Sequence, residues 1–159
     1  MPANGRYIVR ATTPQDREAW VDMWRGYCDF YEASVSDAVT DATWRRMLDA
    51  DSSIFGLVAA SRATGAAVAF ANYVVHPFTW SELPACYLED LFVRPEARGT
   101  GAGSALLQHL IALGGAHGWA RLYWMTRESN CAARRVYERF CARDDFVRYV
   151  MTFDSGPAR

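Results

Sequence analysis

The residues best suited to chemistry form a glycine-rich turn with the sequence Arg98-Gly99-Thr100-Gly101-Ala102-Gly103. An apolar, strand-like run over residues 87–93 comes just before the turn, and a helix-like run over 104–111 comes just after it. A strand, a glycine turn and a helix in this order gather backbone N–H groups that can hold a phosphate, and the arginine adds a fixed positive charge. The turn therefore predicts a site for a phosphate-bearing ligand, with a plain flexible connection as the alternative.

Two common phosphate motifs do not fit this turn. A P-loop ends in Gly-Lys-Ser or Gly-Lys-Thr, and the chain contains neither triplet. The dinucleotide fingerprint requires Gly-x-Gly-x-x-Gly, but the sixth position is Ser104 when counted from Gly99 and Leu106 when counted from Gly101. Both classical nucleotide-binding motifs are therefore excluded.

A third motif, Arg/Gln-x-x-Gly-x-Gly, does fit, at Arg98, Gly101 and Gly103. It resembles the acetyl-CoA pyrophosphate motif of the GCN5-related N-acetyltransferases (GNAT). Residues 87–93, Tyr-Leu-Glu-Asp-Leu-Phe-Val, look like the polyamine and thialysine acetyltransferases of that superfamily. Residues 123–130, Tyr-Trp-Met-Thr-Arg-Glu-Ser-Asn, look like the fungal histone/polyamine and D-amino-acid acetyltransferase group.

The resemblance implies acetyl-CoA as the cofactor, held by backbone groups of a strand, by the glycine turn and by the start of the following helix. The implied cofactor-binding residues are Leu91, Phe92, Val93, Arg98, Gly99, Thr100, Gly101, Ala102, Gly103, Ser104, Asn130, Ala133 and Arg134. A β-bulge near Leu91 would aim N–H groups at the thioester carbonyl and the pantetheine amides. No metal site is expected, because neither the cysteines nor the histidines show ligand spacing.

Two residues are the catalytic candidates. Asn130, Ala133, Arg134 and Tyr137 share one face of a predicted helix, and the resemblance implies that the tyrosine protonates the departing CoA thiolate. A phenol with a pKa of ~10 keeps its proton at neutral pH, whereas a thiolate with a pKa of ~8.5 accepts one. Glu89 is the candidate base for the amine, and strand alternation places it and Asp90 on opposite faces. Packing and surface roles are the respective alternatives for Tyr137 and Glu89.

The substrate pocket is predicted from aromatic and acidic residues near the ends of the elements. An acidic, aromatic mouth suits a cationic amine, whereas core packing or a solvated acidic surface is the alternative. The candidate substrate-binding residues are Tyr27, Tyr31, Tyr73, His76, Trp80, Asp90 and Trp124.

Strand and helix patterns alternate along the chain. Helices are predicted from Pro14 through Tyr31, from Thr40 to Leu48 with Thr40 or Asp41 as its cap, and from Ser129 or Asn130 to about Phe140. A further helix is predicted over the helix-like run 104–111 after the glycine turn, broken by Gly114, Gly115 and Gly118. The predicted strands cover residues 7–11, 54–61, 66–75, 86–93, 122–126 and 146–153.

Length and composition bound the class of protein. A chain of 159 residues, 51% of them hydrophobic, fits a single globular domain over residues 1–159. The formal net charge of −1 gives no electrostatic case for nucleic acid or membrane binding. Widely spaced cysteines and the lack of an apolar leader or long apolar run predict a cytoplasmic protein.

The expected fold is therefore α/β of the GNAT type. Its mixed central sheet has six to seven strands, flanked by about four helices and splayed at the acetyl-CoA site. The expected function is direct transfer of an acetyl group from acetyl-CoA to the primary amine of a small molecule such as a polyamine or an amino acid. A protein lysine or N-terminus as acceptor and a non-catalytic acyl-CoA sensor are the alternatives. The resemblance also implies a homodimer.

Overall fold

A mixed five-stranded sheet forms the centre of the structure, a computed structural model that describes residues 5–153. The strands are paired in chain order, so that β1 to β4 are antiparallel neighbours and β5 runs parallel to β4 at the edge. The strands are β1 (Tyr7–Ala11), β2 (Ile54–Ser61), β3 (Ala67–His76), β4 (Ala85–Val93) and β5 (Arg121–Trp124).

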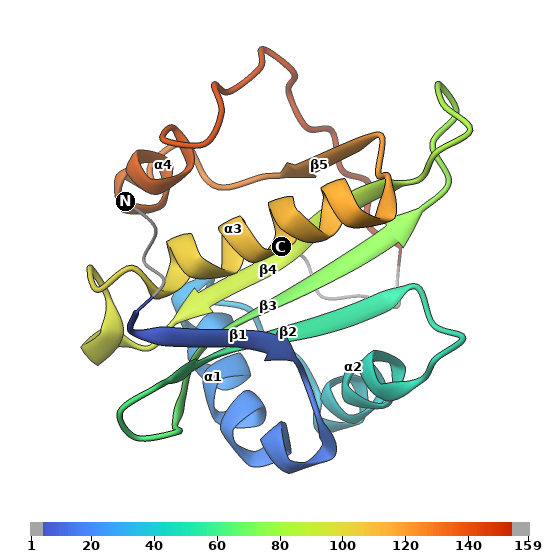
Figure 1. The fold of residues 1–159 in the computed structure, drawn as a ribbon. Helices are drawn as coiled ribbons and strands as arrows, with labels where there is room; N and C mark the ends of the chain where they lie inside the picture. The colour runs from blue at the N-terminus through green and yellow to red at the C-terminus, as the bar shows by residue number, and fades with distance from the viewer. Residues whose placement is uncertain (1–4, 154–159) are drawn as a thin grey trace.

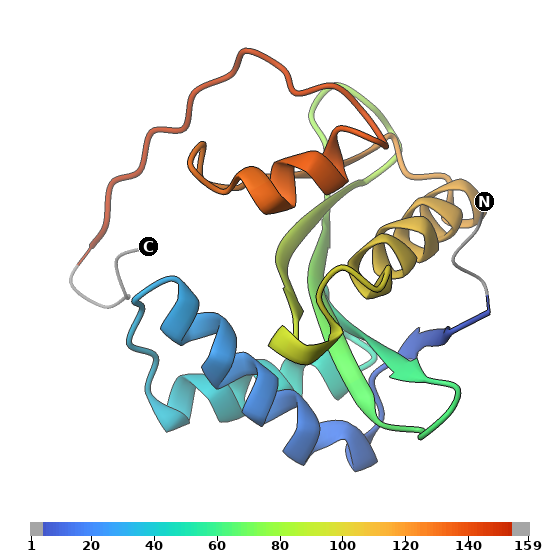
Figure 2. The same cartoon turned by 90° about the vertical axis from the view of Figure 1, so that its left-hand side faces the viewer.

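Helices cover both faces of this sheet, as Figures 1 and 2 show. Helix α3 lies on one face, whereas α1 and α2 lie together on the other. Helix α4 follows β5 and, in Figure 2, lies above α1. The helices are α1 (Arg17–Phe30), α2 (Asp37–Leu48), α3 (Ala102–His117) and α4 (Cys131–Tyr137), with short 3₁₀ turns η1 (Pro14–Asp16) and η2 (Pro95–Ala97).

Two apolar clusters hold the layers together. On the α1 face, Trp20, Met23, Trp24 and Tyr27 recur at helical spacing, and all four side chains are buried against the sheet. On the other face, Leu106, Leu107 and Leu110 of α3 are buried against the strands. The sheet therefore has a separate core on each side, which fixes the positions of β4 and the start of α3.

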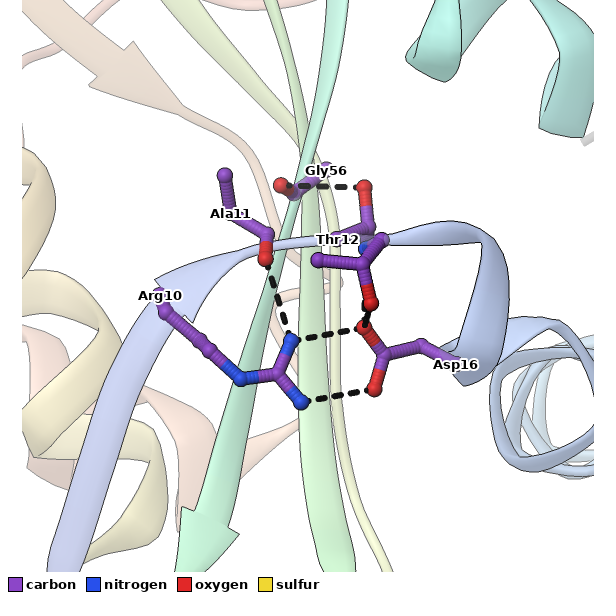
Figure 3. A network of polar contacts seen from close by, with 6 residues as sticks. Arg10, Ala11, Thr12, Asp16 and Gly56 are labelled. Carbon is purple, nitrogen blue, oxygen red and sulfur yellow. Dashed lines mark hydrogen bonds and ion pairs between the residues drawn. The ribbon is translucent and has the colours of Figure 1, made fainter.

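An ion pair between the partly exposed Arg10 and the buried Asp16 fixes the passage from β1 into α1 (Figure 3). The Arg10 guanidinium donates to both carboxylate oxygens of Asp16, at 2.6 and 2.8 Å. The backbone N–H and the hydroxyl of Thr13 both donate to Asp16 Oδ2 at 2.8 Å, which closes a capping box ahead of α1. These bonds hold the pKa of Asp16 down at about 2, chiefly through Arg10 and against the opposing effect of burial.

Helix α2 begins three residues earlier than the sequence pattern predicts. Its cap is Ser36, whose hydroxyl accepts a hydrogen bond from the Val39 N–H at 3.3 Å. The predicted cap Thr40 is instead buried within the helix, where its hydroxyl accepts the indole N–H of Trp24 at 3.2 Å. The prediction of Thr40 or Asp41 as the cap was therefore wrong, because a tertiary contact uses the threonine.

The prediction of six to seven strands was also wrong, since the sheet of the described residues has five. Residues 146–153 follow α4 as an irregular trace (Figure 1), and their side chains are exposed. A strand needs a partner for its backbone N–H and C=O groups, and a local apolar pattern cannot supply one. No described helix is long and apolar enough to cross a membrane.

Candidate active site

One cavity of about 470 Å³ gathers most of the residues expected to bind the cofactor. Its walls come from the end of α1, from β4, from the glycine turn with the start of α3, and from α4. Figure 2 shows α4 above α1, the two helices that contribute to the cavity from opposite ends of the chain. Of the thirteen predicted cofactor-binding residues, the cavity is lined by Leu91, Phe92, Val93, Arg98, Gly99, Gly101, Ala102, Gly103, Ser104, Asn130 and Ala133.

The sheet splays where the cavity begins. Strands β4 and β5 pair from Ala85 and Arg121 as far as Leu88 and Trp124, and β4 then continues alone to Val93. The pairing of β4 with β5 therefore ends at Leu88, and residues 91–93 at the end of β4 line the cavity. A pantetheine arm, which carries amide groups, fits the edge of a strand as an extra strand would.

The glycine turn presents α3 to the cavity. Gly99 and Gly101 have φ of 75° and 96°, values that favour glycine, and α3 begins at the next residue. Arg98 donates from Nε to the Val93 carbonyl at 3.2 Å, which ties the turn to the end of β4. Thr100 does not line the cavity, because its hydroxyl donates to the Ala97 carbonyl on the inner side of the turn.

Asn130 caps α4 and lies at the cavity wall. Its Oδ1 accepts the Ala133 N–H at 3.2 Å, and its Nδ2 donates to the Thr126 hydroxyl at 3.2 Å. Arg134 does not line the cavity; it contacts Glu138 at 3.3 Å and the Glu128 carbonyl at 3.1 Å. The shared face predicted for the α4 residues therefore holds for Asn130, Ala133 and Tyr137 but not for Arg134.

Tyr137 lies in the cavity wall at the end of α4 opposite to its cap, Asn130. Its ring meets the edge of the Trp124 ring, with centroids 5.5 Å apart. Burial, with a smaller contribution from Tyr31, raises the pKa of Tyr137 to about 12. The hydroxyl therefore stays protonated throughout the neutral range and can donate a hydrogen bond to an anion.

A β-bulge changes the directions of the two carboxylates in β4. Leu88 pairs with Tyr73 and Asp90 pairs with Asn72, so Glu89 is the extra β4 residue at the shift in register between these two pairs. Leu88 belongs to the α3-side core, and alternation then turns Glu89 to the α1 side. Asp90 also faces the α1 side, where it contacts Asn72. The expectation that Glu89 and Asp90 face opposite ways was therefore wrong, and neither residue lines the cavity.

The predicted substrate residues separate into two groups. Tyr27 and Tyr31 line the cavity, with their ring centroids 4.8 Å apart, and Trp124 supports Tyr137 from β5. Tyr73 instead packs in the α3-side core against Phe55, because strand alternation turns it away from α1.

Two further candidates lie away from the cavity. His76 lines a separate hollow of about 340 Å³ formed by the loop between β3 and β4, and its Nε2 is 2.8 Å from the Tyr123 hydroxyl. Trp80 on this loop is 86% exposed. The expectation that His76 and Trp80 join the other aromatic residues at one mouth therefore does not match their positions.

Positive charge in the cavity was missed by the sequence reasoning. Arg135 and Arg139, four residues apart at the end of α4, line the cavity together with Arg98. None of the described residues that line it is Asp or Glu. The acidic mouth predicted for a cationic amine is therefore not found at this cavity, and the spacing of the two arginines was the signal that could have revealed them.

The comparisons with known proteins decide the family. A sequence profile of the acetyltransferase (GNAT) family matches residues 20–142. The chain belongs to the GNAT acetyltransferase family. The GNAT chain is 31% identical over 146 residues to the D-amino-acid N-acetyltransferase HPA3 of Saccharomyces cerevisiae (strain ATCC 204508 / S288c), covering 92% of this chain and 91% of that protein.

Solved structures share the fold. A probable acetyltransferase superposes with a TM-score of 0.82 at 19% identity, covering 94% of this chain and 99% of that one. The aminoglycoside N-acetyltransferase AAC(6')-Iy, in complex with the bisubstrate analogue CoA-S-monomethyl-acetylneamine, superposes with a TM-score of 0.78 at 20% identity, covering 92% of this chain and 98% of that one. As a GNAT protein, the chain is an acetyl-CoA-dependent N-acetyltransferase.

Proposed function

We propose that this GNAT enzyme transfers the acetyl group of acetyl-CoA directly to the primary amine of an amino acid, a small acceptor that also carries a carboxylate. The observation that carries this proposal is the charge of the cavity, which has three arginines and no carboxylate among the described lining residues. The name of the yeast relative, a D-amino-acid N-acetyltransferase, supports the same class of acceptor. A polyamine, which carries only positive charge, fits this lining poorly.

The two ends of the cavity have different tasks in this proposal. The N–H groups at the start of α3 and the Arg98 guanidinium bind the pyrophosphate of CoA. The pantetheine arm follows residues 91–93 at the end of β4, and the thioester then lies near Tyr137. Arg135 and Arg139 lie on the same stretch of chain as Tyr137 and bind the acceptor carboxylate through forked N–H donors.

The transfer proceeds in one displacement. The amine nitrogen forms a bond to the thioester carbon as the carbon–sulfur bond breaks, and the backbone N–H groups of residues 91–93 stabilise the developing oxyanion. Because Glu89 does not line the cavity, it accepts, through a water molecule, the proton that the amine loses. Tyr137 donates to the departing thiolate, and solvent restores both residues.

A panel of acceptors tests the substrate class. We expect release of CoA thiol with D- or L-amino acids, and a kcat/KM at least ~10-fold lower with the matching amino-acid amides, because a lost charged hydrogen bond is worth ~1.5–3 kcal/mol. Preference for spermidine over every amino acid would contradict the proposed acceptor. Thiol release with peptides alone would instead favour a protein acceptor.

Substitution of the arginines tests how the carboxylate is bound. The variants Arg135→Gln and Arg139→Gln should raise KM for the amino acid and leave KM for acetyl-CoA nearly unchanged. Arg143→Gln is the matched control, because Arg143 is exposed and pairs with Glu128 outside the cavity. A rise confined to KM for acetyl-CoA would assign the two arginines to a CoA phosphate instead.

A further inference from the structure

A hydrogen-bond network of three side chains, Trp20, Asn72 and Asp90, crosses the apolar core next to the bulge of β4. The Trp20 indole N–H of α1 donates to Asn72 Oδ1 of β3 at 3.2 Å. The other end of the same amide, Nδ2, donates to Asp90 Oδ2 of β4 at 3.0 Å. The three residues are 0%, 2% and 4% exposed, so these bonds form almost without solvent. Polar groups in such surroundings are costly unless every one is paired.

The Trp20 indole determines which way the Asn72 amide is turned and hence the orientation of the whole network. An indole N–H is only a donor, so it must meet the oxygen of the Asn72 amide, and the NH₂ group then points the opposite way. That NH₂ group is then directed at Asp90, whose Oδ2 accepts its hydrogen bond at 3.0 Å. Trp20 therefore holds Asn72 in the one orientation in which it can bind Asp90.

Asn72 lies at the point where the register of the sheet changes. The residue before the change on β3 is Asn72, opposite Asp90, and the residue after it is Tyr73, opposite Leu88. The bond from Asn72 to Asp90 therefore secures one end of the bulge that contains Glu89. The next residue along β4, Leu91, is already in the cavity wall.

We propose that Asn72, oriented by Trp20, is a positioning residue for acetyl transfer: by holding Asp90 it fixes the bulge and thereby the placement of Glu89 and of the β4 backbone at the thioester. This inference rests on the proposed function. Apolar residues at positions 20, 72 and 90 together would pack in this core without any polar partners, so stability alone does not require this hydrogen-bond network. Transfer does require placement, because reacting groups that shift by about 1 Å lose on the order of 10²-fold in rate.

Removal of a single N–H group tests the proposal. Trp20→Phe keeps a ring in the core but frees the Asn72 amide to turn. Trp24→Phe is the matched control, since Trp24 is a stacked neighbour in the same core and loses an indole bond of the same 3.2 Å length, to Thr40. We expect kcat to fall about 10-fold in Trp20→Phe only, with KM for acetyl-CoA unchanged in both and similar losses of melting temperature.

A second pair of variants covers the case in which Trp20→Phe fails to fold. Asn72→Leu removes both bonds at nearly constant volume, and Thr40→Val removes the control bond from its other side. Calorimetric binding of acetyl-CoA reports whether each variant is folded. Equal kcat in the Trp20 and Trp24 variants, or in the Asn72 and Thr40 variants, would overturn the positioning role while leaving the proposed function intact. No turnover of any amine by the unaltered protein would overturn the proposed function, and the positioning role with it.

Discussion

The Tyr137 hydroxyl is a weaker acid than an ordinary phenol, and this affects how it can assist the leaving group. With a pKa of about 12, set mainly by burial, it lies ~3.5 units above an ordinary thiol at ~8.5. Complete proton transfer to such a thiolate is uphill by ~5 kcal/mol. In the proposed mechanism Tyr137 therefore acts first as a hydrogen-bond donor to the thiolate, and full transfer becomes favourable only as the same burial raises the pKa of the thiol.

Removal of this hydroxyl should slow the chemical step without weakening cofactor binding. We expect Tyr137→Phe to lower kcat by about 10²-fold and to leave KM for acetyl-CoA nearly unchanged. Because the pKa is about 12, the unaltered enzyme should show no decline in kcat caused by Tyr137 between pH ~7 and ~10. Steady-state rates across this range check both points, and a Phe variant with full activity would remove Tyr137 from the mechanism.

At the scale of elements, the turn before α3 depends on glycine at one position in particular. Gly101 has φ of 96°, whereas Gly115 lies within α3 with open space where a Cβ would be. We expect Gly101→Ala to destabilise the fold by roughly 1–2 kcal/mol and to weaken acetyl-CoA binding. The control Gly115→Ala should stabilise it by up to ~1 kcal/mol, with unchanged binding. Denaturant unfolding and calorimetry measure both, and equal effects of the two variants would contradict a special role for the turn.

The ion pair between β1 and α1 makes the free energy of unfolding depend on pH. The pKa of Asp16 is lowered to about 2 in the folded protein, from an ordinary value of 3.8. Its ion pair with Arg10 therefore stabilises the fold above pH ~4, and this contribution is lost as the pH falls towards 2. Asp16→Asn should lower the free energy of unfolding by ~1–3 kcal/mol at pH 7 and by little near pH 2.

An exposed ion pair provides the control for Asp16. Asp41 pairs with Arg17, and both side chains are 52% exposed. Asp41→Asn should therefore change the free energy of unfolding by less than ~1 kcal/mol at any pH. A change of less than ~1 kcal/mol in Asp16→Asn at pH 7, or a change that persists at pH 2, would contradict the assignment of this pH dependence to Asp16.

The elements differ in how far the sequence could predict them. Strands 7–11 and 54–61 have the predicted bounds, because alternation and a Gly65 turn are local signals. The bulge at Glu89 could not be predicted in the same way, since it arises from the register with β3 and not from any period along β4. Most residues predicted to bind the cofactor do line the cavity, whereas Arg135 and Arg139 were missed although their spacing of four residues in the predicted helix was a signal for a shared face.

At the scale of the whole molecule, the segment 146–153 exposes several large apolar side chains. Phe146, Tyr149 and Phe153 are 84%, 92% and 76% exposed, and exposed apolar patches often mark contacts between proteins. We expect the full chain to sediment as a homodimer and a chain ending at Asp145 to sediment as a monomer with a similar melting temperature. A monomeric full chain, or a dimer that persists after truncation, would contradict this expectation.

Two-substrate kinetics tests direct transfer to an amino acid most directly. Initial rates are measured with acetyl-CoA and a D-amino acid both varied, while mass spectrometry follows the products. Direct transfer predicts intersecting double-reciprocal lines and one N-acetylated amino acid for each CoA thiol released. Parallel lines with an acetylated enzyme, or thiol release without an N-acetylated product, would contradict it.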